Sequence, residues 1–137
     1  MKKITLALCV DDRGGMAFNN RRQSRDRVMI KDLMDNTSEN IYIEEYSEAL
    51  FSEYKGRTVT SPSPLEVCPE GGICFIERDF PKPYIDIAET VILYRWNKKY
   101  PFDLLLDMSS LKSFKLIEQY EFEGSSHEKI TKEVYKK

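Results

Sequence analysis

The fold is decided by the stretch Ile4-Thr5-Leu6-Ala7-Leu8-Cys9-Val10, which runs directly into Asp11-Asp12-Arg13-Gly14-Gly15. A short, continuous run of apolar residues is typical of a strand that is buried on both faces of a sheet. The aspartates and glycines that follow it favour a turn. The sequence therefore predicts a central strand over residues 4–10 that opens into a loop.

Downstream of this strand, helical and strand patterns alternate. Residues 16–25 are polar and without a clear period, which predicts a long loop. Residues 26–36 carry a helical apolar stripe, and Ser24 or Asp26 can cap its start. The patterns that follow predict a strand over 41–43, a helix over 47–54, an edge strand over 58–60, a break over 61–64, a strand over 73–76, one or two helical turns over 81–88 and a strand over 90–96.

The end of the chain carries a different strand pattern. Residues 114–122 alternate, which predicts a half-buried antiparallel strand with one face formed by Phe114, Leu116, Tyr120 and Phe122. Residues 130–135 fit either a partner strand or a helix. We therefore predict an α/β fold in one domain over residues 1–137: a mixed, mostly parallel sheet with flanking helices and a C-terminal antiparallel hairpin.

The composition excludes several classes of protein. Hydrophobic residues make up 41% of the chain and the net charge is −2, which argues against disorder and against a surface that grips nucleic acid everywhere. No apolar run approaches the roughly 20 residues that a membrane span needs. The 3 cysteines include no CxxC pair, and 1 histidine leaves little for a zinc site. We expect a cytoplasmic protein with reduced thiols, no metal site and no membrane contact.

The strongest local signal is the segment 21–27, which brings together Arg21, Arg22, Arg25 and Arg27. Guanidinium groups suit phosphate or carboxylate, and the start of a helix favours anions. With Ser24, Asp26 and Asp11, these arginines form the predicted ligand-binding site. Simpler interpretations stay open: arginines that pair with Asp11 and Asp12, an Asp26 that only caps the helix, and an Asp11 that only forms a turn.

Two further segments carry reactive or stacking residue types. Ser125-Ser126-His127-Glu128 contains a serine, a histidine and an acid, but sequence neighbours seldom form a catalytic triad. We interpret this segment as hairpin structure in which a serine caps a turn. Tyr94–Tyr100 mixes aromatic and basic residues, which suits either core packing or stacking on single-stranded RNA.

The order and spacing of these segments resemble dihydrofolate reductase. In that family a first strand leads through a mobile loop with glycine and methionine into a helix whose acid holds the pterin, and Asp26 is the matching residue. The closing run is similar as well, through 89–96, Tyr100-Pro101-Phe102, 114–122, His127 and 130–135. The resemblance implies a trimmed dihydrofolate reductase fold, a cleft for a small molecule, and NADPH as a possible cofactor.

Two features of that family are replaced in this sequence. Asn20-Arg21-Arg22-Gln23 stands where the family has Pro-Trp, and Glu77-Arg78 follows the strand 73–76 where the family has its glycine pair. We therefore predict a protein that binds a small anionic or nucleotide-like ligand in a reductase-like cleft, without the family's reductase activity. The alternatives are a residual NADPH-dependent reductase, an RNA-binding or nuclease-type protein, and a protein-interaction module.

A second resemblance involves three short segments. The residues 9–12, 21–27 and 124–131 are similar to those of small uncharacterised proteins of clostridia-like bacteria that carry the label ribonuclease Z. That enzyme class is a zinc hydrolase with a multi-histidine motif. A chain with 1 histidine cannot build such a two-metal site, so we interpret the label as mistaken.

Overall fold

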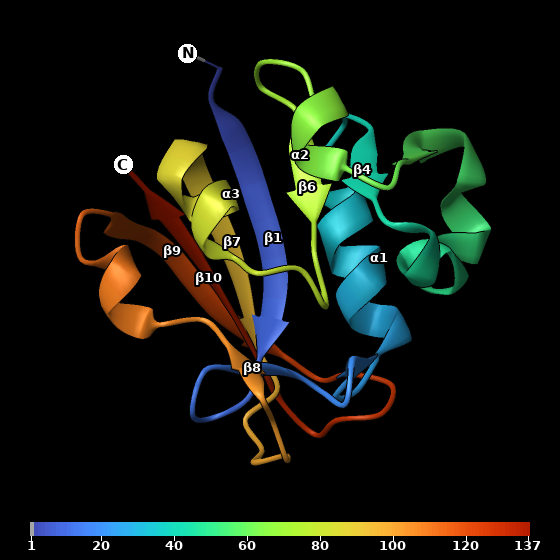
Figure 1. Cartoon of the computed structure of the whole chain (residues 1–137). Helices are drawn as coiled ribbons and strands as arrows, with labels where there is room; N and C mark the ends of the chain where they lie inside the picture. The colour runs from blue at the N-terminus through green and yellow to red at the C-terminus, as the bar shows by residue number, and fades with distance from the viewer. Residues whose placement is uncertain (1) are drawn as a thin grey trace.

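A seven-stranded sheet forms the centre of the molecule (Figure 1). The computed structural model describes residues 2–137. The sheet has the order β5-β4-β6-β1-β7-β10-β9, and its strands are β1 (Ile4–Val10), β4 (Ile41–Ile43), β5 (Thr58–Thr60), β6 (Ile73–Phe75), β7 (Ala88–Arg95), β9 (Lys115–Phe122) and β10 (Ile130–Lys136). The strand β1 runs parallel to β6 and β7, whereas β10 runs antiparallel to β7 and β9. These pairings confirm the predicted mixed, mostly parallel sheet and identify residues 130–136 as a strand.

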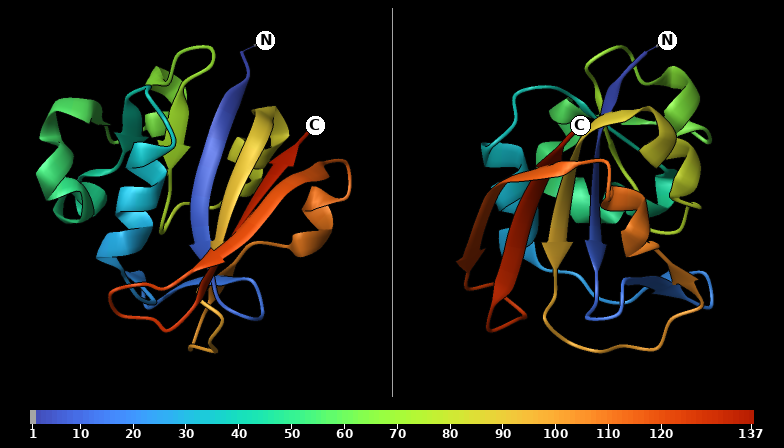
Figure 2. Two further views of the ribbon diagram at one scale, coloured as in Figure 1. Left: turned by 180° about the vertical axis from the view of Figure 1, so that it is seen from behind. Right: turned by 90° about the vertical axis from the view of Figure 1, so that its left-hand side faces the viewer.

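The apolar run of β1 is continuous because each face of the sheet has its own core. Leu6 and Leu8 pack into one core with α2 (Pro64–Val67), α3 (Lys82–Ile87) and η2 (Met108–Leu111). Ala7 packs into the other core, beneath α1 (Arg27–Asp35) and η1 (Glu45–Arg57). Figure 2 shows the two helical layers on opposite sides of the sheet. Both layers bury apolar surface against the same strand, as its sequence requires.

The predicted loop over 16–25 is wrong for part of its length, because it contains two short strands. The strands β2 (Gly15–Phe18) and β3 (Arg21–Arg22) form a hairpin, and β8 (Leu104–Leu105) pairs with β2 to complete a second sheet. Asn19 and Asn20, with φ of 52° and 61°, make the two-residue turn of this hairpin. Asparagine tolerates this left-handed backbone, which hairpin turns of this length require. The Asn19-Asn20 pair in the sequence was therefore an indication of a hairpin turn.

Two other predicted elements also differ from the structure. The helix expected over 47–54 is a series of 3-10 turns over Glu45–Arg57, interrupted by non-helical backbone at Phe51 and Tyr54. The interruption accompanies the burial of Phe51, whose ring meets Phe75 edge-on at 5.3 Å. The strand β9 is less buried than its alternation predicts, since Leu116 and Ile117 are exposed. It is the last strand of the sheet and pairs on one side only.

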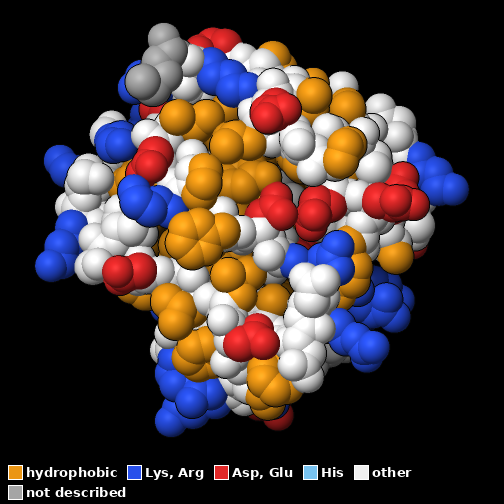
Figure 3. All heavy atoms as spheres, viewed as in Figure 1, with side chains coloured by type: hydrophobic (Ala, Val, Ile, Leu, Met, Phe, Trp, Pro, Cys, Tyr) orange, Lys and Arg blue, Asp and Glu red, His pale blue; other side chains and the backbone are white. Residues whose placement is uncertain are grey.

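Hydrophobic side chains gather in the middle of one face of the molecule (Figure 3). They surround a cavity of about 620 Å³ between α3, β8 and the end of β10, where Phe80 and Leu105 are exposed. Among residues 2–137, no helix has the length and apolar character needed to cross a lipid bilayer.

A buried ion pair fastens α1 to the antiparallel end of the sheet. The Lys132 ammonium of β10 lies 3.0 Å from the Asp32 carboxylate of α1, and both side chains are largely buried. The Tyr94 hydroxyl donates to the same carboxylate at 2.6 Å, and Tyr120 donates to its other oxygen. The Asn36 side-chain amide also donates to this carboxylate, which thus has one cation, two hydroxyl groups and an amide as partners, as a buried charge requires.

We expect Lys132→Met to lower the free energy of unfolding by about 3 kcal/mol, because it leaves the Asp32 carboxylate buried without its cation. Adding Asp32→Asn to the same chain should restore most of that loss, since no uncompensated charge remains. Urea unfolding of both variants measures these effects. Lys129→Met is the matched control: its ion pair with Glu121 is exposed, so a change of less than about 0.5 kcal/mol is expected.

Candidate functional site

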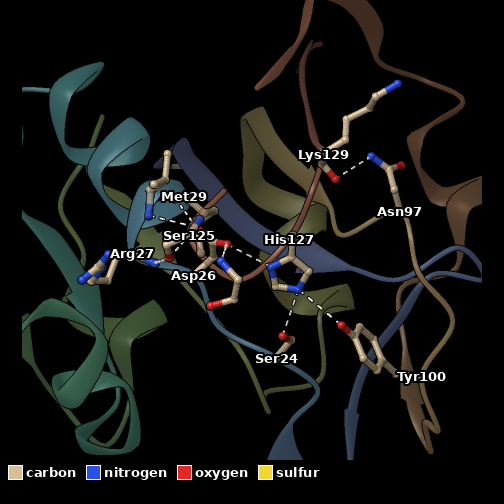
Figure 4. A network of polar contacts seen from close by, with 11 residues as sticks. Ser24, Asp26, Arg27, Met29, Asn97, Tyr100, Ser125, His127 and Lys129 are labelled. Carbon is tan, nitrogen blue, oxygen red and sulfur yellow. Dashed lines mark hydrogen bonds and ion pairs between the residues drawn. The ribbon is translucent and has the colours of Figure 1, made fainter. Parts of the chain in front are cut away.

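Asp26 lies at the centre of a polar network that joins the start of α1 to the loop between β9 and β10 (Figure 4). Its carboxylate caps the helix by accepting from the backbone N–H groups of Val28 and Met29. The same carboxylate accepts from the backbone N–H groups of Ser125 and Ser126 at 2.9 and 2.7 Å. Asp26 is therefore the helix cap that one interpretation of the sequence predicted, and it also holds the distant loop.

The donors around Asp26 favour its ionised form. Burial alone would raise the pKa of Asp26, but hydrogen bonds from His127 and from the N–H groups of Ser125, Ser126 and Met29 outweigh burial and lower the pKa to about 2. Gly124 permits this close approach, because a Cβ atom at that position would collide with the Asp26 carboxylate. The carboxylate is an acceptor in each of these contacts.

His127 is the second member of the network. Its Nδ1 atom lies 3.0 Å from Asp26 Oδ2, and its Nε2 atom lies 3.0 Å from Ser24 Oγ and 3.3 Å from the Tyr100 hydroxyl. The ring stacks on Trp96 at 4.4 Å between centroids and is almost completely buried. Because the ionised Asp26 can only accept, Nδ1 carries the hydrogen in the contact with Asp26.

The loop over 125–128 is hairpin structure, as its sequence predicted, but its histidine has partners far along the chain. Ser125 donates to Asp26 through both its N–H and its hydroxyl group, and Gly124 closes the turn by donating to the His127 carbonyl. The serine whose hydroxyl contacts the His127 ring is Ser24, not Ser125 or Ser126. Sequence reasoning missed the grouping of Ser24, His127, Tyr100 and Trp96. The signal that could have pointed to it was the 1 histidine of the chain.

The four arginines of the segment 21–27 divide into two sets. Arg22 points inward, where its Nε and Nη2 atoms donate to the Glu77 carboxylate at 2.7 and 3.0 Å. Arg21, Arg25 and Arg27 are exposed, and their guanidinium groups make no hydrogen bond or ion pair within residues 2–137. The predicted pairing of these arginines with Asp11 and Asp12 is not found among the described residues.

Arg25 and Arg27 border a cavity of about 420 Å³ between α1, η1 and the loop over 124–126. Its other lining residues include the buried carboxylate of the network and an apolar wall, namely Asp26, Ile30, Leu50, Tyr54, Ser125 and Ser126. The structure thus brings three of the predicted site residues, Arg25, Asp26 and Arg27, to one cavity. Arg21, Arg22, Ser24 and Asp11 do not line it.

Asp11 serves the loop that follows β1. Its buried carboxylate accepts from the backbone N–H groups of Arg13, Gly15 and Tyr100 and from the side-chain amide of Gln23. Burial acts to raise the pKa of Asp11, but these hydrogen bonds outweigh it and lower the pKa. This geometry fits the turn interpretation of Asp11, since its acceptor sites are filled by its own chain.

The end of β6 does not fit the diphosphate of a dinucleotide. Glu77 follows this strand and is buried, and its carboxylate accepts from Arg22 and from the Ser47 hydroxyl at 2.7 Å. Diphosphates bind where glycines let the backbone approach and free N–H groups face the ligand. Here the side chain of Glu77 and its ion pair with Arg22 occupy the end of the strand, so Arg22 is not available to bind a phosphate.

The comparisons with known proteins support the fold and no more. No protein-family model matches the sequence, and no curated protein sequence matches it. Among 244 matching chains of solved structures is the dihydrofolate reductase from Enterococcus faecalis, complexed with NADP(H) and RAB-propyl. It is 11% identical, the likeness covers 98% of this chain and 95% of that chain, and the TM-score is 0.67. The chain therefore has a dihydrofolate reductase-like fold, and the resemblance to clostridial proteins stays a prediction.

We expect Asp26→Asn to destabilise the protein by about 2 kcal/mol at pH 7, because the native fold lowers the pKa of this carboxyl by nearly two units. The pKa is lower in the folded state, so this contribution is complete above about pH 4 and is lost as the pH falls toward 2. Chemical unfolding of both proteins at pH 7, 4 and 2.5 measures the difference.

Asp12→Asn is the matched control for this experiment. Asp12 is exposed and its carboxylate makes no hydrogen bond among the described residues, so little change is expected at any of the three pH values. A constant difference between the wild type and Asp26→Asn over this range would show that the Asp26 charge contributes nothing.

Proposed function

We propose that this protein binds a small anionic or nucleotide-like molecule in the cavity between α1, η1 and the loop over 124–126. The observation that carries the proposal is the pair of guanidinium groups at Arg25 and Arg27, which border the cavity and have no partner within residues 2–137. Free arginines in a net acidic chain favour phosphate or carboxylate ligands. Both stand at the start of α1, where the helix dipole adds to the attraction.

The walls of the cavity suggest what else the ligand carries. Ile30, Leu50 and Tyr54 offer apolar surface against which a planar ring can pack. Glu53 on the η1 side is an acceptor, which suits a ring that bears N–H groups. The Asp26 carboxylate also borders this space, but its hydrogen bonds to the loop already occupy both of its oxygen atoms.

We propose binding without nicotinamide-dependent reduction. The argument is the buried Glu77 carboxylate at the end of β6, where a dinucleotide would need glycines and free N–H groups. The solved reductase with the similar fold was complexed with NADP(H), so NADPH is included as a test ligand. Strong binding of NADPH would instead favour the residual reductase.

The test is isothermal titration of the purified protein with inorganic pyrophosphate, AMP, folate and NADPH. We expect at least one of the first three to bind and NADPH to bind no more tightly than AMP. Arg25→Ala and Arg27→Ala should each weaken binding about tenfold, since a charge-assisted hydrogen bond contributes about 1.5 kcal/mol or more.

Arg21→Ala is the matched control, because Arg21 is an equally exposed arginine of the same segment that does not line the cavity. Its affinity should equal that of the wild type. Equal loss of affinity in all three variants would point to general charge attraction and would contradict a specific cavity site.

A further inference from the structure

Ser24, His127 and Asp26 have the geometry of a charge-stabilised nucleophile. The distances are 3.0 Å from Ser24 Oγ to His127 Nε2 and 3.0 Å from His127 Nδ1 to Asp26 Oδ2 (Figure 4). This series of contacts identifies a nucleophile, a base and an acid that orients the base. It does so whatever the order of the three residues in the sequence. Here they come from the segment before α1 and from the loop between β9 and β10.

The protonation states in this chain run in the direction that catalysis needs. The Asp26 carboxylate accepts from backbone N–H groups on both of its oxygens, so it is ionised and His127 Nδ1 must be the donor. With the hydrogen on Nδ1, the lone pair of an uncharged imidazole lies on Nε2, which faces the Ser24 hydroxyl. When this hydroxyl attacks, Nε2 can take its proton and Asp26 stabilises the resulting imidazolium ion.

The base is also held firmly. The His127 ring is stacked on Trp96 and almost completely buried, so its orientation is set by packing as well as by Asp26. The backbone N–H groups of Ser24 and Arg25 donate no hydrogen bond within residues 2–137. Both groups therefore remain available as hydrogen-bond donors.

From this geometry we propose that Ser24 is a nucleophilic serine, with His127 as its general base and Asp26 as the positioning acid, and that it accepts a short acyl group from an ester. A cavity of about 10 Å³ lies beside Ser24, and its lining mixes apolar side chains with the polar side chains of Arg22, Gln23 and Glu77. A void of this size holds about one water molecule, so we choose acetyl, a small acyl group, for the test. The proposal does not depend on the anion cavity, which Ser24 does not line.

Hydrolysis of the ester by Ser24 needs water as its only other reactant. Ser24 Oγ forms a bond to the carbonyl carbon of the ester while its proton moves to His127 Nε2. The bond from that carbon to the alcohol oxygen then breaks, and the alcohol leaves with the proton from Nε2. Water, deprotonated by the same nitrogen, next attacks the acetyl-serine, which releases acetate and restores the serine.

Tyr100 gives the proposal a second, independent test. Its hydroxyl lies 3.3 Å from the same Nε2 atom and competes with Ser24 for the single lone pair of the neutral ring. Without this hydroxyl, Ser24 should be the only hydroxyl group that contacts the Nε2 atom of His127. Tyr100→Phe is therefore expected to raise the reactivity of Ser24, whereas a purely structural network would not respond in this way.

The experiment treats the full-length protein with p-nitrophenyl acetate, follows release of p-nitrophenolate, and locates the acetyl group by peptide mass spectrometry after acid quenching. We expect acetylation at Ser24, and its rate to fall about 100-fold in His127→Gln, the usual size of a general-base contribution. Ser24→Ala should show no acetylation at this position, and Tyr100→Phe should be acetylated at Ser24 faster than the wild type. Thermal unfolding shows which variants are folded.

Ser113→Ala is the matched control. Ser113 is more exposed than Ser24, lies far from His127 in the sequence, and its hydroxyl makes no hydrogen bond among the described residues, so it represents a serine without a base. Its loss should leave the rate unchanged. Acetylation of Ser113 in preference to Ser24, or the same rate in folded Ser24→Ala and wild type, would overturn the proposal. A slower reaction in Tyr100→Phe would overturn the assigned competition.

Discussion

The carboxylate of Asp26 joins two segments that lie about a hundred residues apart in the chain. It caps α1 on one side and receives two backbone N–H groups and the His127 ring on the other. A buried carboxylate is stable only when such donors compensate for its lost hydration. The position of α1, the path of the loop over 124–127 and the burial of His127 therefore all depend on this one group, and so do the cavity and the serine beside them.

A second buried carboxylate shapes the neighbouring edge of the sheet. Glu77 follows β6 and binds Arg22 and Ser47, which ties the β2–β3 hairpin and η1 to the sheet. The same pairing fills the place where strands of this fold direct their carboxyl ends toward a ligand. One ion pair thus holds the hairpin and also occupies the end of β6.

Prediction from the sequence succeeded where a residue pattern reflects local geometry. The period and composition of the apolar residues correctly predicted the strands 4–10, 41–43 and 58–60. A capping residue at its start correctly predicted the helix after Asp26. It failed where a contact with a distant segment overrides the local pattern. The interrupted turns of η1 accompany the packing of Phe51 against Phe75, and most side chains of the alternating strand β9, at the end of the sheet, are exposed.

The sequence by itself determined the fold class, the central place of β1, and a cluster of arginines at the start of a helix. The tertiary structure alone decided which charges are free and which are paired. Arg22 and Arg25 look alike in the sequence, but of the two only Arg22 forms an ion pair with a buried carboxylate, because β6 brings Glu77 close to the hairpin. Likewise Ser24 and Ser125 are equivalent by residue type, but chain folding over long distances places the hydroxyl of Ser24 against the Nε2 atom of His127. Hydrogen bonds depend on positions to within tenths of an ångström, which a pattern of residue types cannot specify.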